Sequence, residues 1–500
     1  MNKNNTMQQN GIHRAHGWEM ALFALNSAAT NLYGLMLVYI SYYTTGLVGL
    51  SVVIIGMLGT AMRFWDAVTD PFLGMILDKT NGKFGKNRPI MVIGNLIMAS
   101  ATFVMYHFLH LLPENYTLRL ISYIILYAIY IIGYTCQMTV TKSAQSCLTN
   151  DPSQRPTFAI YDSIYGTVIM TVVYWMVANV WTPKYTYVDA AGETVSAFSN
   201  PAMFHQIWWT IALTSAVFTV LAVIGIWRKD RKEYWGLGTT QKVGFRDYVD
   251  VIKHNRPMQM LMLAACSDKL CSRTQGNAVV TIMLFGIICG NYGLSGELQG
   301  FLTIPLIIIL IGGISGIASR LGQMKAMLYG TWGAMLFTGL NFLLCVFGDP
   351  KTFSFQHVSF FTVAFCVCWI LSKGFAQLAS YIVTPMIADC TDYEVYRSGR
   401  YVPGLMGTIF GFVDKSISAF SDTIVSVSIA LIGFTSMQPT PETPYTSGIF
   451  WVTMFLVFGL PYIGWILNLI ALKFYPLSKE KMEEIQQTVA EIKAKAAEEA

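Results

Sequence analysis

Two aspartates one helical turn apart in an apolar run have the types and spacing that point most directly to chemistry. They are Asp66 and Asp70, with Arg63 one turn earlier and Thr69 beside them. Residues three or four apart share a helix face, and paired carboxylates in a low dielectric repel one another. A bound Na⁺ or a shared proton relieves that repulsion, and the Thr69 hydroxyl is a hard oxygen ligand of the kind that suits such an ion. The alternative is that Arg63 neutralises Asp66, which leaves Asp70 unexplained. We therefore predict a cation site here.

Other ionisable residues also lie inside apolar runs. Charged groups are costly at that depth, so each indicates either a function or an ion pair. Acids and bases nearly balance, which favours pairing of many of them. The set comprises Asp162, Asp268, Asp414, Asp422, Lys142, Lys269, Arg273, Lys373 and Lys415.

The elements that hold these residues must be membrane-spanning helices. Only 12% of the residues are charged and 54% are hydrophobic, and apolar runs long enough to cross a bilayer recur along the chain. A spanning segment must satisfy its own backbone, and no alternating barrel-strand pattern occurs. The nine cysteines lie mostly inside these runs, without metal-ligand spacing, and read as buried apolar residues. The expected spans are 20–45, 52–78, 89–112, 118–148, 158–181, 206–228, 258–290, 297–318, 325–347, 356–388, 402–434 and 446–474.

The distribution of basic residues predicts the orientation. Lysine and arginine concentrate in the loops after even-numbered spans, whereas the loops after odd-numbered spans carry little beyond Lys184 and Lys351. By the positive-inside rule, both termini are cytoplasmic. We expect a multi-pass protein of the bacterial inner membrane.

The longest basic loop divides the spans into six plus six, a layout of transporters built from two parallel repeats. The fold class expected is an all-α membrane protein of twelve helices in two six-helix halves. The expected domains are a first half at 1–228, a cytoplasmic linker at 229–257, a second half at 258–475 and an amphipathic cytoplasmic tail at 476–500. In the tail, Ser478 can cap a helix that would lie on the membrane surface. Its apolar residues at helical spacing are Met482, Ile485, Val489 and Ile492.

Several motifs together resemble one transporter family. The run Trp65-Asp66-Ala-Val-Thr-Asp70-Pro71-Phe-Leu-Gly74 is followed by Gly85-Lys86-Asn87-Arg88-Pro89, and Ala388-Asp389-Cys390-Thr391-Asp392-Tyr393 precedes the eleventh span. In this order, and with Phe474-Tyr475-Pro476-Leu477 near the end, they resemble the glycoside–pentoside–hexuronide:cation symporters. That family is the melibiose-permease-like branch of the major facilitator superfamily.

The resemblance implies roles for individual residues. Asp66 and Asp70 would ligate the cation, with Thr69 and Thr135 as additional oxygen ligands. Lys415 matches a family lysine that helps hold the charge network, to which we also assign Arg63.

Several positions that form the sugar site in the galactoside members carry different residues in this chain. Asn31 stands where they have an aspartate, and Met138 and Lys142 replace an aspartate and a tryptophan. No arginine stands near Asp162, where those members have one.

One face of the fourth span carries the remaining candidates for substrate binding. Thr135, Met138, Lys142 and Gln145 share that face by helical spacing. We hypothesise that Lys142 engages an anionic substrate, such as a hexuronide or a sulfo-sugar. The equally open alternative is that Asp162 neutralises it.

These observations predict cation-coupled symport of a sugar or glycoside, with Na⁺ or H⁺ as the coupling ion, by alternating access of two halves. Alternatives are a carrier of a non-sugar amphiphile such as a lysolipid, or a structural or sensory membrane protein. An enzyme is not expected, because the sequence lacks the Gly-x-Gly-Asp and His-Glu-x-x-His motifs and a nucleotide loop. We expect no cofactor, no metal beyond a Na⁺ at Asp66 and Asp70, no nucleic-acid partner and a monomer in the bilayer.

Overall fold

A computed structural model describes residues 14–79, 82, 84–149, 155–231, 245–313, 319–398 and 403–498. These residues are almost entirely helical, with one two-residue hairpin between β1 (Tyr187–Val188) and β2 (Thr194–Val195). Each of the twelve expected spans coincides with a helix or an interrupted helix, so the all-α prediction is confirmed.

The chain divides into two compact units. Unit 1 comprises residues 1–239 and 433–442, and unit 2 comprises 240–432 and 443–500. The segment 433–442 belongs to unit 1 because it bonds directly to residues there. The Tyr42 hydroxyl donates to the Pro439 carbonyl at 2.8 Å, and the Val52 amide donates to the Thr435 carbonyl at 3.0 Å.

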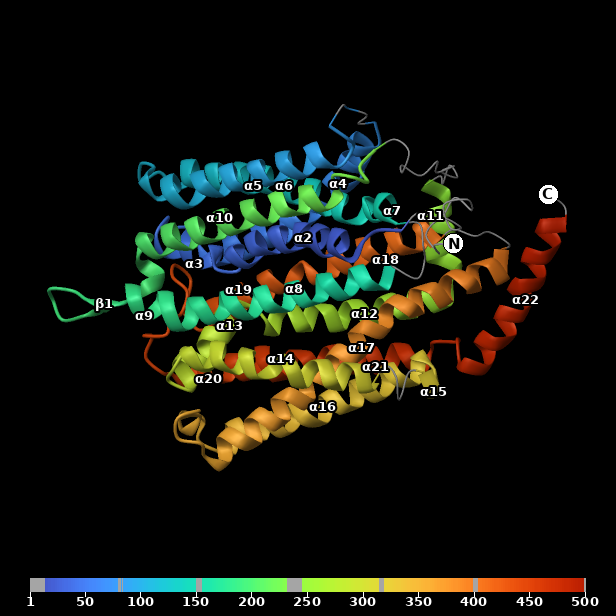
Figure 1. Ribbon diagram of the computed structural model, residues 1–500. Coiled ribbons are helices and arrows are strands. Elements are labelled where there is room, and N and C mark those ends of the chain that lie inside the picture. The colour runs from blue at the N-terminus through green and yellow to red at the C-terminus, as the bar shows by residue number, and fades with distance from the viewer. Residues whose placement is uncertain are drawn as a thin grey trace. The chain divides into compact units, whose positions relative to one another are not determined.

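Unit 1 is a bundle of long helices joined by short elements. Within it, α2, α5, α6 and α10 run side by side (Figure 1). The long helices are α2 (Gly17–Leu37), continued by α3 (Ile40–Gly46), α4 (Val52–Lys79), α5 (Arg88–Phe108), α6 (Tyr116–Ser143), α8 (Arg155–Met176) and α10 (Pro201–Ile226). The short elements are the 3-10 turns η1 (Leu109–Leu111) and η3 (Ala197–Ser199), the π-helical turn η2 (Val177–Trp181), α7 (Gln145–Leu148) and α9 (Thr182–Tyr185).

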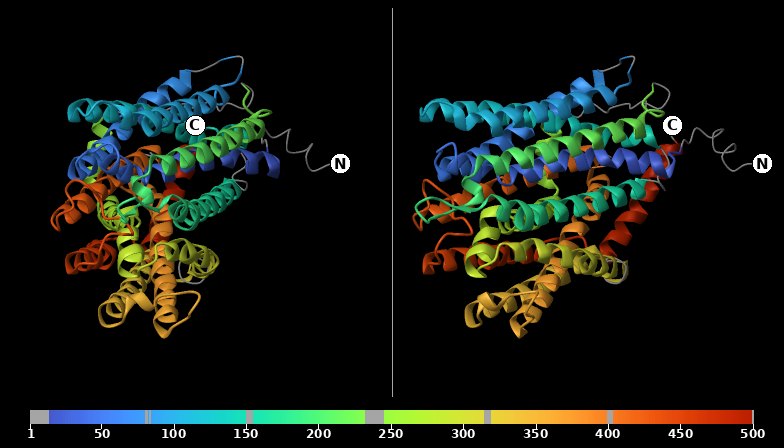
Figure 2. Two further views of the ribbon diagram at one scale, coloured as in Figure 1. Left: turned by 90° about the vertical axis from the view of Figure 1, so that its left-hand side faces the viewer. Right: turned by 60° about the vertical axis from the view of Figure 1, so that its left-hand side comes forward.

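Unit 2 has more interrupted helices. Its α16 packs along α17, which the two views of Figure 2 show in yellow and orange. Its longer helices are α12 (Arg256–Gln275), α14 (Gly293–Gly313), α16 (Gln323–Phe347), α17 (Phe360–Ser398), α18 (Pro403–Ser418), α19 (Phe420–Ala430), α21 (Leu460–Lys473) and α22 (Lys479–Glu498). Shorter pieces are α11 (Phe245–His254), α13 (Ala278–Thr281), α15 (Ser319–Leu321), α20 (Ser447–Met454), the 3-10 turn η7 (Pro350–Thr352) and the π-helical turns η5 (Ile282–Ile288) and η8 (Phe455–Gly459).

Nine helices in the described part of the chain are long and apolar enough to cross a membrane, or ten if one bent pair counts as a span. Two of the remaining expected spans, α12 and the pair α18 and α19, are helical as well. They carry several of the ionisable residues named above, including Asp268, Lys269 and Lys415, which lowers their hydropathy. The count of twelve crossings therefore stays a prediction.

Three expected boundaries are wrong. The seventh span is not continuous, because α12 ends at Gln275 and a new helix starts at Ala278. The tenth span extends ten residues further than expected, to Ser398, so Asp389–Tyr393 lies on a helix. The predicted linker 229–257 contains a helix of its own, α11, and α12 already starts at Arg256 within it.

The tail helix packs on protein through part of the apolar face that the sequence predicts. Ile485 on α22 is fully buried, and Met482 packs against the same apolar cluster, which also includes Cys390 and Tyr475. The Gln486 amide donates to the Asp392 carboxylate at 2.6 Å. Burial raises the pKa of Tyr475 above its usual range. The side chains of Val489 and Ile492 lie outside the described residues.

Candidate functional site

Three of the four predicted cation ligands lie on α4 in unit 1, and two of these three are buried. Asp66 is 4% exposed and Thr69 is 7% exposed, whereas Asp70 and Arg63 are half-buried. A buried carboxylate requires hydrogen-bond donors or a counter-charge. Helix α4 therefore presents a polar stripe that its neighbours must satisfy.

Thr135 on α6 supplies one of these partners. Its hydroxyl, which is fully buried, donates to Oδ1 of Asp66 at 3.0 Å. The Thr69 hydroxyl donates to the Asp66 backbone carbonyl at 3.0 Å, and the two threonine oxygens lie 3.4 Å apart. The structure thus brings Asp66, Thr69 and Thr135 together from two helices.

This oxygen cluster has fewer protons than contacts. Two hydroxyls carry two protons, yet three oxygen–oxygen contacts of 3.0–3.4 Å join them to Asp66 and to each other. Unless one hydroxyl proton is shared between two acceptor oxygens, one of the three contacts must bring two oxygen lone pairs together. A hard cation, which prefers carboxylate, hydroxyl and carbonyl oxygens, would be stabilised by such an arrangement. Asp70 adds a second carboxylate one turn along α4.

Close packing of α5 on α6 fixes the position of Thr135. A Cβ on Gly133 would lie 2.7 Å from the Gly94 carbonyl oxygen, and a Cβ on Gly94 would lie 2.9 Å from Cys136 Cβ. Only glycines allow the two backbones to approach so closely. Gly133 lies two residues before Thr135 on α6. The contact therefore fixes the axial position and the rotation of α6 relative to α5 close to Thr135.

A buried amide network on the opposite side of α6 was missed by the sequence analysis. Gln137, fully buried, accepts from Thr30 at 2.8 Å and donates to Thr219 at 3.2 Å. Asn26 donates to Thr141 at 2.7 Å. The network therefore ties α6 to α2 and α10. Neutral amides in apolar runs are the sequence signal that would have indicated it.

The predicted substrate residues are spread over four helices of unit 1, namely α2, α6, α7 and α8. Asn31 on α2 is half-buried and donates to the Ser27 hydroxyl at 3.5 Å. Met138 on α6 and Asp162 on α8 are half-buried, and Lys142 on α6 is exposed. No ion pair joins Lys142 to Asp162, both of which the structure describes.

The stripe expected on the fourth span is interrupted before Gln145. Helix α6 ends at Ser143, and Gln145 begins the separate four-residue helix α7. The Gln145 side-chain amide donates to the Thr141 carbonyl at 3.2 Å. This bond replaces the helical backbone hydrogen bond to Thr141 that is lost at the break between α6 and α7. Gln145 therefore does not continue one helix face with Thr135, Met138 and Lys142.

Lys415, the remaining member of the predicted charge network, lies on α18 in unit 2 and is half-buried. Three other ionisable residues of unit 2 each have a neutral hydrogen-bond partner. The Trp465 indole donates to Asp268 at 2.9 Å, and Asn277 donates to Asp422 at 3.2 Å. The Lys373 ammonium donates to the side-chain oxygen of Gln275.

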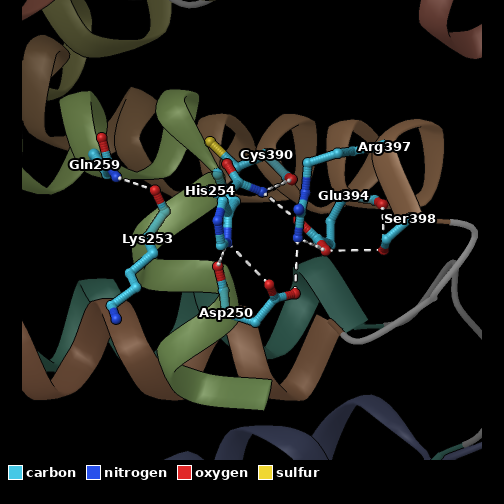
Figure 3. Close-up of polar contacts among 9 residues, drawn as sticks. Asp250, Lys253, His254, Gln259, Cys390, Glu394, Arg397 and Ser398 are labelled. Atoms are coloured by element: carbon cyan, nitrogen blue, oxygen red, sulfur yellow. Dashed lines mark hydrogen bonds and ion pairs between the residues drawn. The ribbon is translucent and has the colours of Figure 1, made fainter. Parts of the chain in front are cut away.

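A second polar cluster joins α11, α12 and the end of α17 in unit 2 (Figure 3). The fully buried Glu394 accepts from Arg397 at 2.7 Å and from Asn255 at 3.0 Å. Arg397 also binds Asp250 at 3.0 Å, and Asp250 lies 2.9 Å from His254. Because Asn255 also caps α12 by accepting from the Met258 amide at 3.0 Å, this cluster fixes α11 against two longer helices. The sequence analysis gave these residues no role.

Metal ligands do not gather elsewhere in the described residues. No group of three or more His, Cys, Asp or Glu side chains there could hold a metal ion. The nine cysteines are free thiols, seven of them buried.

The fold is similar to that of solved transporters. The chain superposes on a bacterial homologue of the human lysosomal transporter Spinster with a TM-score of 0.61 at 14% identity, over 94% of this chain and 98% of that one. A likeness at this identity shows the fold alone.

The family follows from the sequence match. The model for the MFS/sugar transport proteins matches residues 22–479, and the chain belongs to that family. It is 21% identical to an isoprimeverose transporter of Lactiplantibacillus pentosus, over 91% of this chain and 88% of that protein. It is 22% identical to a glucuronide carrier protein homolog of Escherichia coli (strain K12), over 93% of both. The protein is therefore a sugar-type transporter of the membrane and not an enzyme.

Proposed function

We propose that this chain is a cation-coupled symporter that imports a sugar or glycoside across the bacterial inner membrane. Transport would proceed by alternating access, with both termini in the cytoplasm and the monomer as the working unit. Na⁺ or H⁺ would be the coupling ion.

The oxygen cluster around Asp66 carries this proposal. Asp66, Thr69 and Thr135 bring a carboxylate, two hydroxyls and a backbone carbonyl within 3.4 Å contacts, and Asp70 lies one turn away. Binding one Na⁺ or H⁺ here offsets one of the two carboxylate charges, so the bound and free states differ in charge inside the membrane. A difference of that kind can couple cation binding to substrate affinity.

We further propose that the transported sugar carries an acidic group. Lys142 places an exposed ammonium on α6, without an ion pair to Asp162. A named relative is a glucuronide carrier homolog, and a lysine is a suitable partner for such a carboxylate. We therefore expect a hexuronide or a sulfonated sugar among the substrates.

Asp70→Asn tests the coupling. Purified protein in proteoliposomes is given a Na⁺ or a proton gradient, and uptake of radiolabelled sugars and sugar acids is measured. We expect the wild-type protein to accumulate cargo and Asp70→Asn to lose gradient-driven accumulation, because the substitution removes one negative charge from the cation site. Downhill exchange of cargo should continue.

The matched control is Asp349→Asn. Asp349 is exposed and caps η7 through a side-chain oxygen, which asparagine retains. It should accumulate cargo like the wild type. Full accumulation by Asp70→Asn, or no accumulation by the wild type under either gradient, would show that the coupling proposal is wrong.

A further inference from the structure

Lys373 on α17 is a positive charge whose direct contacts in unit 2 are with neutral groups. Its ammonium donates to the side-chain oxygen of Gln275 and lies 5.2 Å from the centre of the Trp369 ring. Among the described residues, no carboxylate lies within ion-pair distance of it. An ammonium in a membrane-spanning helix is costly without a counter-charge.

The surroundings hold Lys373 in place. The Gln275 amide donates to the Val457 carbonyl in the π-helical turn η8 at 2.7 Å, which directs its side-chain oxygen to Lys373. Trp369 stacks on Phe365 at 5.3 Å and meets Phe458 edge-on at 6.5 Å. Three helical elements therefore position one ammonium group.

Asp268, the acid on the same helix as Gln275, interacts with Lys373 electrostatically at longer range but forms no direct ion pair with it. Asp268 is 7% exposed and accepts from the Trp465 indole at 2.9 Å. One ammonium N–H is occupied by Gln275, and two remain for another acceptor.

We propose that Lys373 and Gln275 form an anion-recognition subsite for the acidic group of the cargo, a carboxylate or a sulfonate. The inference rests on the proposed function and extends it, because it assigns to unit 2 a residue that selects acidic over neutral sugars. An incoming anion accepts the two remaining ammonium protons, and the charge-assisted bonds compensate for the desolvation of both groups. Gln275 keeps the lysine oriented when the cargo leaves.

The test compares sugars that differ only in the acidic group. Uptake into proteoliposomes is measured for methyl β-D-glucuronide against methyl β-D-glucoside, and for the galacturonide against the galactoside. We expect the wild type to favour the acid in at least one pair, and Lys373→Gln to reduce that ratio by roughly tenfold or more, the loss expected for a hydrogen bond to a charged group. Lys269→Gln removes an exposed lysine of α12 and should leave the ratio unchanged.

A second variant retains the lysine. Gln275→Glu is nearly isosteric and places a carboxylate beside Lys373, so an internal ion pair replaces the ion pair with the cargo. It should reduce the acid-to-neutral ratio as Lys373→Gln does, even if Lys373→Gln does not fold.

The outcomes separate the two proposals. A wild type that transports neither member of any pair contradicts the proposed function. A wild type that transports sugars but favours the neutral member of every pair overturns the subsite. So does an acid preference that persists in both Lys373→Gln and Gln275→Glu.

Discussion

At the scale of single residues, a small number of hydroxyls and charges determine what this protein can bind. Asp66 is nearly buried, and the hydrogen bond from Thr135 partly compensates for its desolvation. A hydrogen bond to a charged group contributes about 1.5–3 kcal/mol, which is less than the cost of burying a carboxylate in an apolar medium. The Asp66 carboxylate and the neighbouring hydroxyls are oxygen ligands of the kind that a hard cation prefers.

Lys142 permits a prediction at this scale. If Lys142 contacts the acid of the cargo, Lys142→Gln should lower uptake of acidic glycosides several-fold and leave neutral glycosides unaffected, because only the charge-assisted bond is lost. Competition between matched acidic and neutral glycosides measures this. An unchanged preference would remove Lys142 from the substrate site and leave Lys373 as the candidate.

At the scale of elements, close helix contacts place the site. Gly133 and Gly94 let α6 approach α5, and Gln137 then bonds to α2 and α10. Helices in a membrane gain little from hydrophobicity against one another, so small residues and polar bonds determine their packing. The position of Thr135 beside Asp66 is a consequence of these contacts.

Gly133→Ala tests this packing. The added Cβ would lie 2.7 Å from the Gly94 oxygen and 2.9 Å from the Met98 nitrogen, both backbone atoms. We expect a loss of about 1–3 kcal/mol in stability and a lower thermal unfolding temperature in detergent. Cation binding, followed as the Na⁺-dependent thermal shift, should weaken in the same variant because Thr135 moves.

Gly166→Ala on α8 is the matched control. A Cβ there has no atom within 4 Å. Alanine also favours a helix interior over glycine by about 0.5–1 kcal/mol. The control should therefore be neutral or slightly stabilising, and equal unfolding temperatures for the two variants would contradict the packing argument.

At the scale of the whole molecule, the chain forms two units, and each encloses polar groups of its own. Unit 1 contains the oxygen cluster, and unit 2 contains Lys373 and the cluster around Glu394. The tail helix α22 is part of unit 2, because Ile485 packs beside Met386 and Cys390 in its core. It covers the end of α17, where Asp392 accepts from Gln486.

Ile485→Asp should release the tail from unit 2. A carboxylate at this fully buried position has no counter-charge, and such groups cost about 3–5 kcal/mol. We expect faster amide hydrogen exchange over residues 479–488, with the exchange of α6 unchanged. Gln487→Asp, at an exposed position of the same helix, should exchange like the wild type. Persistent protection of the tail in Ile485→Asp would disprove its docking.

The sequence by itself determined the class of this protein and the local arrangement of its charges. Hydropathy locates spanning segments because the bilayer fixes their length. Helical periodicity places Asp66 and Asp70 on one face because it depends only on neighbouring residues. A local pattern does not show where a long helix breaks, so the interruptions at Ala144 and at Gly276–Asn277 went unrecognised.

Only the tertiary structure decided which side chains meet. Thr135 was assigned to the cation site by family resemblance, and its bond to Asp66 joins residues 69 positions apart. The network of Gln137, the contact of Lys373 with Gln275 and the docking of Ile485 likewise depend on contacts between distant segments. Such contacts depend on the rotation and axial position of whole helices. Close backbone contacts such as Gly94–Gly133 determine these two quantities. The periodicity within a single segment carries no information about them.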